Sequence, residues 1–224
     1  MGLTRARVVQ AAIELADAHG LDAVTMRRVA EGLGVVPMAL YKHVGDKEDL
    51  VDGMVDAVIE EFPPTPVTTD WQRAVATVVG GARTVVTAHP WARRALETRT
   101  VRTPVVLGYM ERISQCFLTA GFTPDQTHHV MHLLGSRIWG FSPELFTAPA
   151  AGEARPVRKS DPRRSAPDPA DYPGILAIAA EAHARRPGAT GCDEDFEFGF
   201  ALEVLLDGIA RLREAGFESP RSSG

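Results

Sequence analysis

The sequence predicts an all-α protein. Apolar residues recur at intervals of three and four through most of the 224 residues, and the alternating pattern typical of strands is scarce. Many of the periodic segments begin near a residue that favours helix N-termini and end near glycine or proline. With 45% hydrophobic and 24% charged residues, the chain has the composition of a globular protein that can bury a core.

The first 62 residues predict four short helices. We expect them over residues 4–19, 25–34, 37–43 and 46–62. Each begins at a residue common at helix N-termini, namely Thr4, Thr25, Pro37 and Asp46. Gly34 would allow a tight turn after the second helix. Prolines at positions 63, 64 and 66 end the fourth helix, so residues 63–70 are expected to connect two domains.

Residues 71–217 predict a larger helical domain. Its helices are expected over residues 71–89, 104–120, 124–146, 172–186 and 193–215. Residues 148–170 contain five prolines and five basic residues, which predicts a mobile loop. Between Phe196 and Leu212 apolar residues occupy nearly every helical face, which indicates burial on several sides. A twofold interface with a second copy would bury them, and burial inside one subunit is the alternative.

Charge and composition limit the classes of protein to which the chain can belong. The net charge of −5 argues against indiscriminate polyanion binding, so any DNA-binding surface must be a local patch. No segment reaches the ~20 apolar residues of a membrane span, and the N-terminus does not resemble a secretion signal. Cys116 and Cys192 are too far apart in sequence to suggest a disulfide framework. We therefore expect a reduced, cytoplasmic protein that has no membrane partner.

Residues 25–43 have the pattern of a helix-turn-helix. Val29, Ala30 and Leu33 would face a core from the first helix, and Leu40 from the second. A second helix of this kind enters the major groove of DNA. The side chains expected to point outward or to reach phosphates or bases are Thr25, Arg27, Met38, Ala39, Tyr41, Lys42 and His43. The alternative is an ordinary helical corner, in which Tyr41 is a half-buried core aromatic residue.

The N-terminal segment resembles the DNA-binding domain of the TetR family of transcriptional regulators. The resemblance lies in residues 25–30 (TMRRVA), 33–35 (LGV), 40–44 (LYKHV) and 46–50 (DKEDL). It implies that DNA backbone or bases are contacted by Arg27, Tyr41, His43 and Lys47, and that base edges are faced by Pro37, Met38 and Ala39. These last three side chains carry no amide that could pair with adenine. We therefore expect them to recognise thymine methyl groups, and Arg27 to make the main hydrogen-bonded base contact.

The second half resembles the regulatory domain of tetracycline repressor-like members of the same family. The resemblance lies in Ala120-Gly121-Phe122, in Gly135 and Gly140 of a long helix, and in residues 196–199 with Leu202-Glu203. It implies a homodimer on a palindromic operator and a cavity for a small-molecule effector. The candidates for lining this cavity are Trp91, Met110, Ile113, His128, Met131, Trp139 and Glu144, although Met and Trp at helical spacing also suit a core. Residues 96–99 lack the histidine that would hold a tetracycline–magnesium complex, so another effector is expected.

Three histidines on one expected helix form a separate candidate site. The spacing of His128, His129 and His132 would suit zinc, but the sequence contains no HExxH motif. We expect these imidazoles to line the interface or the cavity without a metal or other cofactor, and a metal site is the alternative.

These patterns together predict a ligand-responsive transcriptional repressor that a small molecule releases from its operator. One alternative is an activator that binds DNA constitutively and has no ligand. The other is a metal-dependent enzyme built on the histidine cluster, which the sequence disfavours because a nucleophile motif, a phosphate-binding glycine loop and paired catalytic acids are all lacking.

Overall fold

The computed structural model describes residues 2–66, 68–98, 102–139, 171–186 and 193–220. Every regular element in these ranges is a helix, so the predicted all-α fold class is confirmed. The chain divides into two compact units, one made of residues 1–141 and 202–224 and the other of residues 142–201. Among the described helices, none combines the length and the apolar character that crossing a membrane requires.

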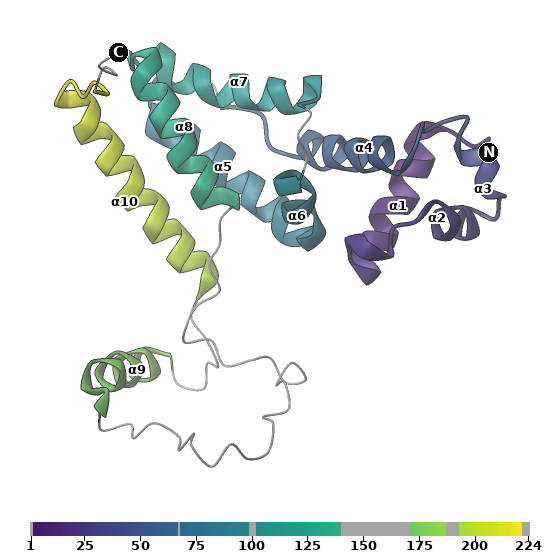
Figure 1. Cartoon of the computed structure of the whole chain (residues 1–224). Coiled ribbons are helices and arrows are strands. Elements are labelled where there is room, and N and C mark those ends of the chain that lie inside the picture. The colour runs from purple at the N-terminus through teal and green to yellow at the C-terminus, as the bar shows by residue number, and fades with distance from the viewer. Residues whose placement is uncertain (1, 67, 99–101, 140–170, 187–192, 221–224) are drawn as a thin grey trace. The chain divides into compact units, whose positions relative to one another are not determined.

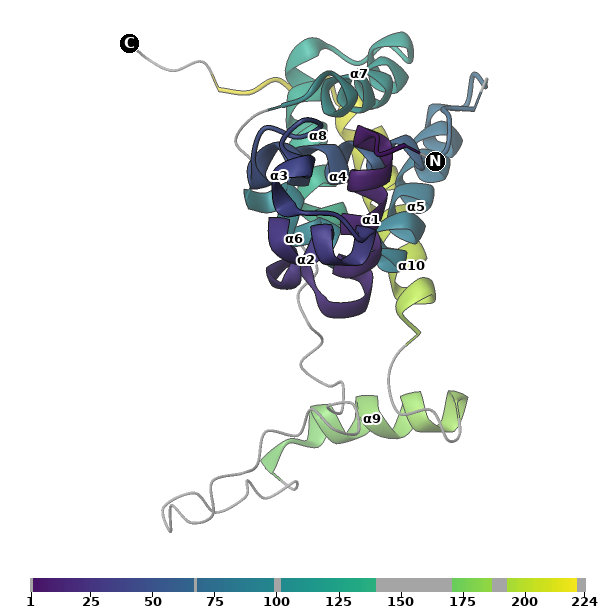
Figure 2. The same ribbon diagram turned by 90° about the vertical axis from the view of Figure 1, so that its right-hand side faces the viewer.

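The first four helices begin where the sequence predicts. They are α1 (Arg5–His19), α2 (Met26–Leu33), α3 (Pro37–Leu40) and α4 (Lys47–Glu60), and Figures 1 and 2 show α1, α2 and α3 gathered around the start of α4. The side chains of Thr4, Thr25 and Asp46 each accept a hydrogen bond from the backbone N–H three residues later. Gly34 ends α2 in the left-handed region, at φ 67° and ψ 31°. This geometry produces the turn that a helix-turn-helix requires.

The interior of this N-terminal region is closely packed. Its core consists of side chains that are at most 1% exposed, among them Val8, Ala12, Val29, Ala30, Leu40 and Leu50. At Gly53 of α4 a Cβ atom would lie 2.9 Å from Cγ2 of Val9 and 3.3 Å from Nη2 of Arg5. The close approach of α1 to α4 therefore depends on glycine at this position.

The following helices form the larger part of the first unit. They are α5 (Trp71–Ala88), α6 (Pro90–Thr98), α7 (Pro104–Thr119) and α8 (Pro124–Trp139). The rings of Trp71, Phe117 and Phe122 pack against one another with centroid separations of 5.0–5.6 Å. Gly121, at φ 87°, turns the chain between α7 and α8. These contacts hold α5, α7 and α8 around one core.

Helix α6 is absent from the sequence prediction, which treated Pro90 only as the end of the preceding helix. Pro90 does follow α5, but it also opens α6, because proline lacks the N–H that the first helical turn leaves unpaired. His89, at φ −120° and ψ 72°, makes the corner between the two helices. The buried residues of α6 are Trp91, Ala92 and Ala95, a spacing that was visible in the sequence.

The last two helices are α9 (Pro173–Arg185) and α10 (Glu194–Glu214). The side chains of α10 do not share one environment: Leu202, Leu206 and Ile209 are buried, whereas Phe196, Phe200 and Val204 are exposed. Among the described residues, therefore, the helix carries both buried and exposed large apolar side chains. The expected loop over residues 148–170 lies outside the described residues.

Candidate nucleic-acid interface and internal cavity

The tip of the helix-turn-helix presents an apolar surface. Met38 is 73% exposed and Tyr41 is 48% exposed, while Leu40 between them is fully buried. Val36, the N-cap of α3, is 67% exposed and was not among the expected contact residues. Because Val36 directly precedes Pro37, the sequence could have placed it among the expected contact residues.

The polar residues expected at DNA have partners within the protein. The hydroxyl of Thr25 accepts the N–H of Arg28, so its first role is to cap α2. Nε of Arg27 donates to Glu31 across 2.8 Å on the exposed side of α2. Arg27 must therefore exchange or share this carboxylate when it contacts a base or a phosphate. Lys42 and Lys47, with the half-buried His43, complete the expected set.

A guanidinium group fixes the segment that follows α3. Nη2 and Nη1 of Arg5 donate to Oδ1 and Oδ2 of Asp49 at 2.6 and 2.9 Å, and Nη1 also donates to the His43 carbonyl at 3.2 Å. Asp49 accepts the Gly45 N–H at 2.7 Å. The hydrogen bonds from Arg5 and then from Gly45 lower the pKa of Asp49. Arg5 thus ties α1 and α4 to the end of the recognition segment, a role that its sequence context did not reveal.

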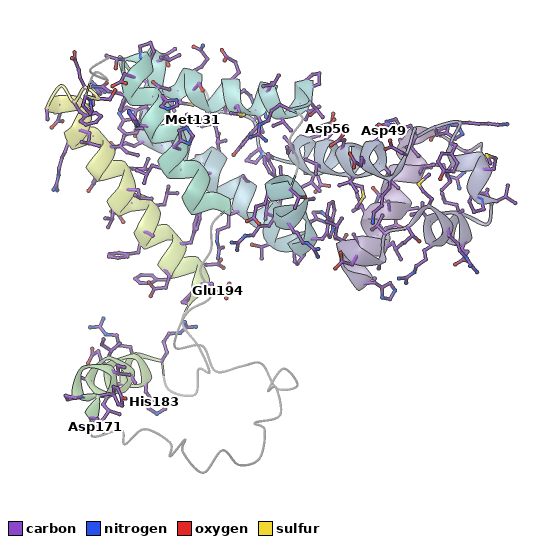
Figure 3. The ribbon with its side chains drawn as sticks, viewed as in Figure 1. Asp49, Asp56, Met131, Asp171, His183 and Glu194 are labelled. Atoms are coloured by element: carbon purple, nitrogen blue, oxygen red, sulfur yellow. The ribbon has the colours of Figure 1, made fainter. Side chains whose placement is uncertain are left out.

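A cavity of about 790 Å³ is lined by α6, α7, α8 and the end of α4. Four of the predicted ligand-binding residues line it: Met110, Ile113, His128 and Met131. Figure 3 marks Met131 on α8. The buried residues Ile59, Ile113 and Leu134 form apolar parts of the wall, while charged side chains of the lining are exposed to solvent. An apolar wall with polar groups at its margin is typical of sites for small organic molecules.

Trp91 lies elsewhere. Its side chain is buried, and its indole N–H donates to Oδ1 of Asp17 at 2.6 Å. Nδ1 of His89 lies 2.8 Å from the same carboxylate oxygen. Trp91 therefore joins α6 to α1 instead of lining the cavity. The side chain of Trp139 and the whole of Glu144 lie outside the described residues.

Two polar residues of the cavity lining were not predicted. Tyr109 and Thr127 both line it, and their hydroxyl oxygens are buried and, within the described part of the chain, have no hydrogen-bond partner. Burial raises the pKa of Tyr109. The signal in the sequence was weak, because each is a single polar residue beside an expected lining residue.

Helix α4 connects the cavity region to the recognition element. Asp49 lies near its beginning and Asp56 farther along toward the cavity region (Figure 3). The hydroxyl of Thr103, which caps α7, donates to Oδ1 of Asp56 at 2.5 Å. Burial raises the pKa of Asp56, and the nearby charges of Asp52 and Glu60 add to this effect. Thr103 therefore joins the beginning of α7 to α4.

The histidine cluster forms part of the cavity. The rings of His128 and His132 lie 4.6 Å apart, and both residues line the cavity. Nε2 of His129 lies 3.7 Å from a carboxylate oxygen of Asp125. Within the described ranges, no group of three His, Cys, Asp or Glu residues has a geometry that could hold a metal ion.

Two family models match the chain in succession. The model described as "Bacterial regulatory proteins, tetR family" matches residues 8–54, and "Tetracyclin repressor-like, C-terminal domain" matches residues 63–213. The second match alone spans well over half of the chain.

Relatives and solved structures agree with these matches. The chain is 28% identical to the HTH-type transcriptional repressor DrrR1 of Streptomyces coeruleorubidus, over 94% of this chain and 78% of the relative. It is 27% identical to the tetracycline repressor protein class G of Vibrio anguillarum, over 95% and 96%. The crystal structure of the Streptomyces coelicolor TetR family protein ActR in complex with (S)-DNPA superimposes with a TM-score of 0.68 at 25% identity, covering 94% of this chain and 98% of ActR.

Proposed function

The chain belongs to the TetR family of transcriptional regulators, and from this premise we propose that it is a homodimeric repressor released from a palindromic operator by a small-molecule effector. Members of this family are regulators and not enzymes, so the alternative of a histidine-dependent enzyme is set aside. The observation that carries the proposal is the cavity of about 790 Å³ whose walls connect through α4 to the helix-turn-helix.

The proposed DNA contacts follow from the exposed tip of the helix-turn-helix. Met38, with Pro37 and Ala39 beside it, would meet base edges in the major groove, where apolar side chains favour thymine methyl groups. The groups proposed to contact phosphates are Thr25, Tyr41, Lys42, His43 and Lys47. Arg27 would supply the main hydrogen-bonded base contact.

The proposed homodimer is supported by the exposed face of α10. Phe196, Phe200 and Val204 are spaced four residues apart, which places them on one face of the helix, and all three are exposed in the single chain. A twofold contact through this face would bury them. Two recognition elements related by the same axis would then meet the two halves of a palindrome.

The proposed release mechanism depends on the side-chain hydrogen bonds that α4 makes with α7 and with α1. An effector in the cavity would move α7, whose cap Thr103 is bonded to Asp56 of α4. Asp49 of the same helix fixes the recognition segment through Arg5, so a shift of α4 would change the distance between the two recognition elements. The effector must bind the released state more tightly, with a coupling of at least about 1–3 kcal/mol. The proposed cavity residues are Met110, Ile113, His128 and Met131, with Trp139 and Glu144 retained from the sequence.

The proposal is tested by selecting the operator from a random duplex library with the purified full chain. We expect a palindrome bound by two chains, and sedimentation should give a dimer without DNA. A monomer at micromolar concentration, or a selected site without twofold symmetry, would contradict the proposal. A promoter that carries the selected site upstream of a reporter separates the repressor from the alternative of a constitutive activator.

A further inference from the structure

An ion pair on the first helix of the helix-turn-helix indicates how the protein would read a base. We propose that Glu31 is a positioning residue that holds Arg27, so that the free end of this guanidinium recognises a guanine in each half of the operator. The inference rests on the proposed function, because it takes α2 and α3 as the DNA-reading element. It adds the base that is recognised and a specificity-determining residue outside the expected contact set.

The hydrogen bond between the two residues uses only one side of the Arg27 guanidinium. Nε of Arg27 donates to Oε1 of Glu31 at 2.8 Å, and within the described part of the chain neither Nη nitrogen has a partner. The side chains of Arg27 and Glu31 are 83% and 59% exposed, so DNA can reach the free nitrogens. Because a guanidinium is planar and rigid, fixing one nitrogen restricts the direction of the other two.

Arg27 differs from the other lysine and arginine side chains of residues 25–47. Arg28, Lys42 and Lys47 are exposed, and in the described ranges none of them pairs with an acid. Unpaired cations suit phosphates, because each phosphate that is neutralised releases counterions and strengthens binding. The charge of Arg27 is balanced by Glu31, whose carboxylate a phosphate would repel. The balanced pair therefore favours an uncharged acceptor, and base edges in the major groove offer such acceptors.

The free end of the Arg27 side chain matches one of the four bases. Its two Nη groups present donors side by side, and guanine carries two neighbouring acceptors, O6 and N7, in the major groove. Adenine carries an amino donor beside its N7, thymine offers O4 beside a methyl group, and cytosine offers a donor. Only guanine can therefore accept two hydrogen bonds from a guanidinium that keeps its Nε on a carboxylate.

Helix α2 itself gains little from this ion pair. Arg27 lies in the first turn of α2 and Glu31 lies one turn later, which is the less favourable order of charges along a helix dipole. Glu181 and Arg185 on α9 form an exposed pair of the same spacing in the favourable order, with Nε of Arg185 at 2.7 Å from Oε1 of Glu181. The position of Glu31 is thus better explained by the orientation of Arg27 than by the stability of α2.

The test replaces each guanine of the selected operator in turn with 7-deazaguanine, which lacks N7 but keeps O6 and normal base pairing. At one position of each half-site this replacement should weaken binding of the natural full chain about tenfold, as measured by fluorescence anisotropy. Arg27→Ala should remove the sensitivity to N7 at that position. Glu31→Ala should reduce it to less than about threefold, because Arg27 remains but its free end is no longer directed.

Two further variants serve as controls. Glu31→Gln keeps an oxygen that can accept the Nε–H of Arg27, so it should retain the sensitivity to N7. Glu181→Ala breaks the matched pair outside the helix-turn-helix and should change neither the affinity nor the sensitivity. The melting temperature of Glu31→Ala should equal that of the natural protein, because the ion pair is exposed.

Several outcomes would overturn the inference. A lower melting temperature of Glu31→Ala with an undiminished sensitivity to N7 would mean that the pair only stabilises α2. Loss of the Arg27 contribution on methylphosphonate substitution of the backbone, without any dependence on N7, would place Arg27 on a phosphate. If a palindrome is selected but none of its guanines depends on N7, the inference fails and the proposed function stands. If no palindrome is selected, the proposed function fails, and the same comparison on the best-bound duplex decides the role of Glu31.

Discussion

The DNA-binding region and the cavity region differ in how completely side chains fill their interiors. Between α1 and α4 the side chains of Val8, Ala12 and Leu50 are fully buried, and a single added carbon at Gly53 would meet a neighbour at 2.9 Å. Among α6, α7 and α8 a cavity of about 790 Å³ stays open, and in the described part of the chain the buried hydroxyls of Tyr109 and Thr127 have no partner. Gly135, which lines this space, would have nothing within 4 Å of an added Cβ atom.

This difference separates the two tasks of a regulator. The DNA-binding region carries its function on its surface, so its interior can be packed for rigidity. The proposed function of the cavity region depends on open space inside it, and a ligand that fills this space would add to the stability of the protein. The region that binds DNA should therefore be sensitive to changes in its core, and the region around the cavity should tolerate or benefit from them.

The largest effect should come from truncating the core of the DNA-binding region. Leu40→Ala removes a fully buried side chain behind the recognition surface and should lower the free energy of unfolding by about 2–5 kcal/mol. Ile113→Ala should cost less, because the site already borders the cavity and the space left by the side chain is continuous with it. Urea denaturation followed by circular dichroism gives both values. If Ile113→Ala is the more damaging, the contrast between the regions is wrong.

Two glycine substitutions should change stability in opposite directions. Gly135→Ala places a methyl group in open space on a helix and should raise the free energy of unfolding by about 1 kcal/mol. Gly53→Ala gains the same helix propensity but forces Cβ against Val9 and Arg5, an overpacking that costs about 1–3 kcal/mol. We expect a net loss there, measured by the same denaturation. A gain of equal size at both sites would show that the DNA-binding region is no more tightly packed than the cavity.

The sequence predicted most of the fold because the local signals were strong. Thr4, Thr25 and Asp46 cap helices as expected, and Gly34 makes the predicted turn. The missed helix α6 shows the limit of such signals. Pro90 follows the end of α5 and also begins α6, and the sequence alone does not say whether a proline ends a helix, begins one or does both.

The sites were harder to predict, because they depend on contacts between residues far apart in the chain. Met110 and Met131 were expected from the family resemblance, and both line the cavity. Trp91 was expected there because aromatic side chains often line such cavities, but it lies elsewhere, bound to Asp17 of α1. Arg5 reaches Asp49 across 44 positions of sequence, so its function appears only in the folded chain.

A smaller effect is expected at the surface of the DNA-binding region, where function and stability separate. Met38→Ala should leave the melting temperature unchanged, because the side chain is 73% exposed. It should weaken operator binding if Met38 packs against a thymine methyl group. Replacing that thymine by deoxyuridine removes one methyl group, worth about 0.8 kcal/mol or fourfold in affinity for the natural protein. In the Met38→Ala variant the same replacement should have less effect, and an unchanged fourfold loss would exclude the contact.

The smallest effects should distinguish the two ends of α4 by their dependence on pH. The pKa of Asp49 is lowered by Arg5 and Gly45, so this carboxylate stabilises the fold above its ordinary pKa of 3.8. The contribution is lost as the pH falls through the lowered value. Asp49→Asn should therefore be less stable than the natural protein at neutral pH, and the difference should disappear in acid. Because the ion pair is partly exposed, we expect less than about 1 kcal/mol.

Asp56, at the cavity end, should behave in the opposite way. Burial raises its pKa, so its charge destabilises the fold at neutral pH, and this cost disappears as the pH falls below the ordinary value of 3.8. Asp56→Asn keeps an oxygen that can accept the Thr103 hydroxyl but removes the charge. The variant should therefore be slightly more stable at pH 7 and equal to the natural protein in acid, as measured by melting temperature across this range. A loss of stability at pH 7 would mean that the charge of Asp56 strengthens its hydrogen bond with Thr103. Asp56 would then stabilise the fold in its charged form, as Asp49 does.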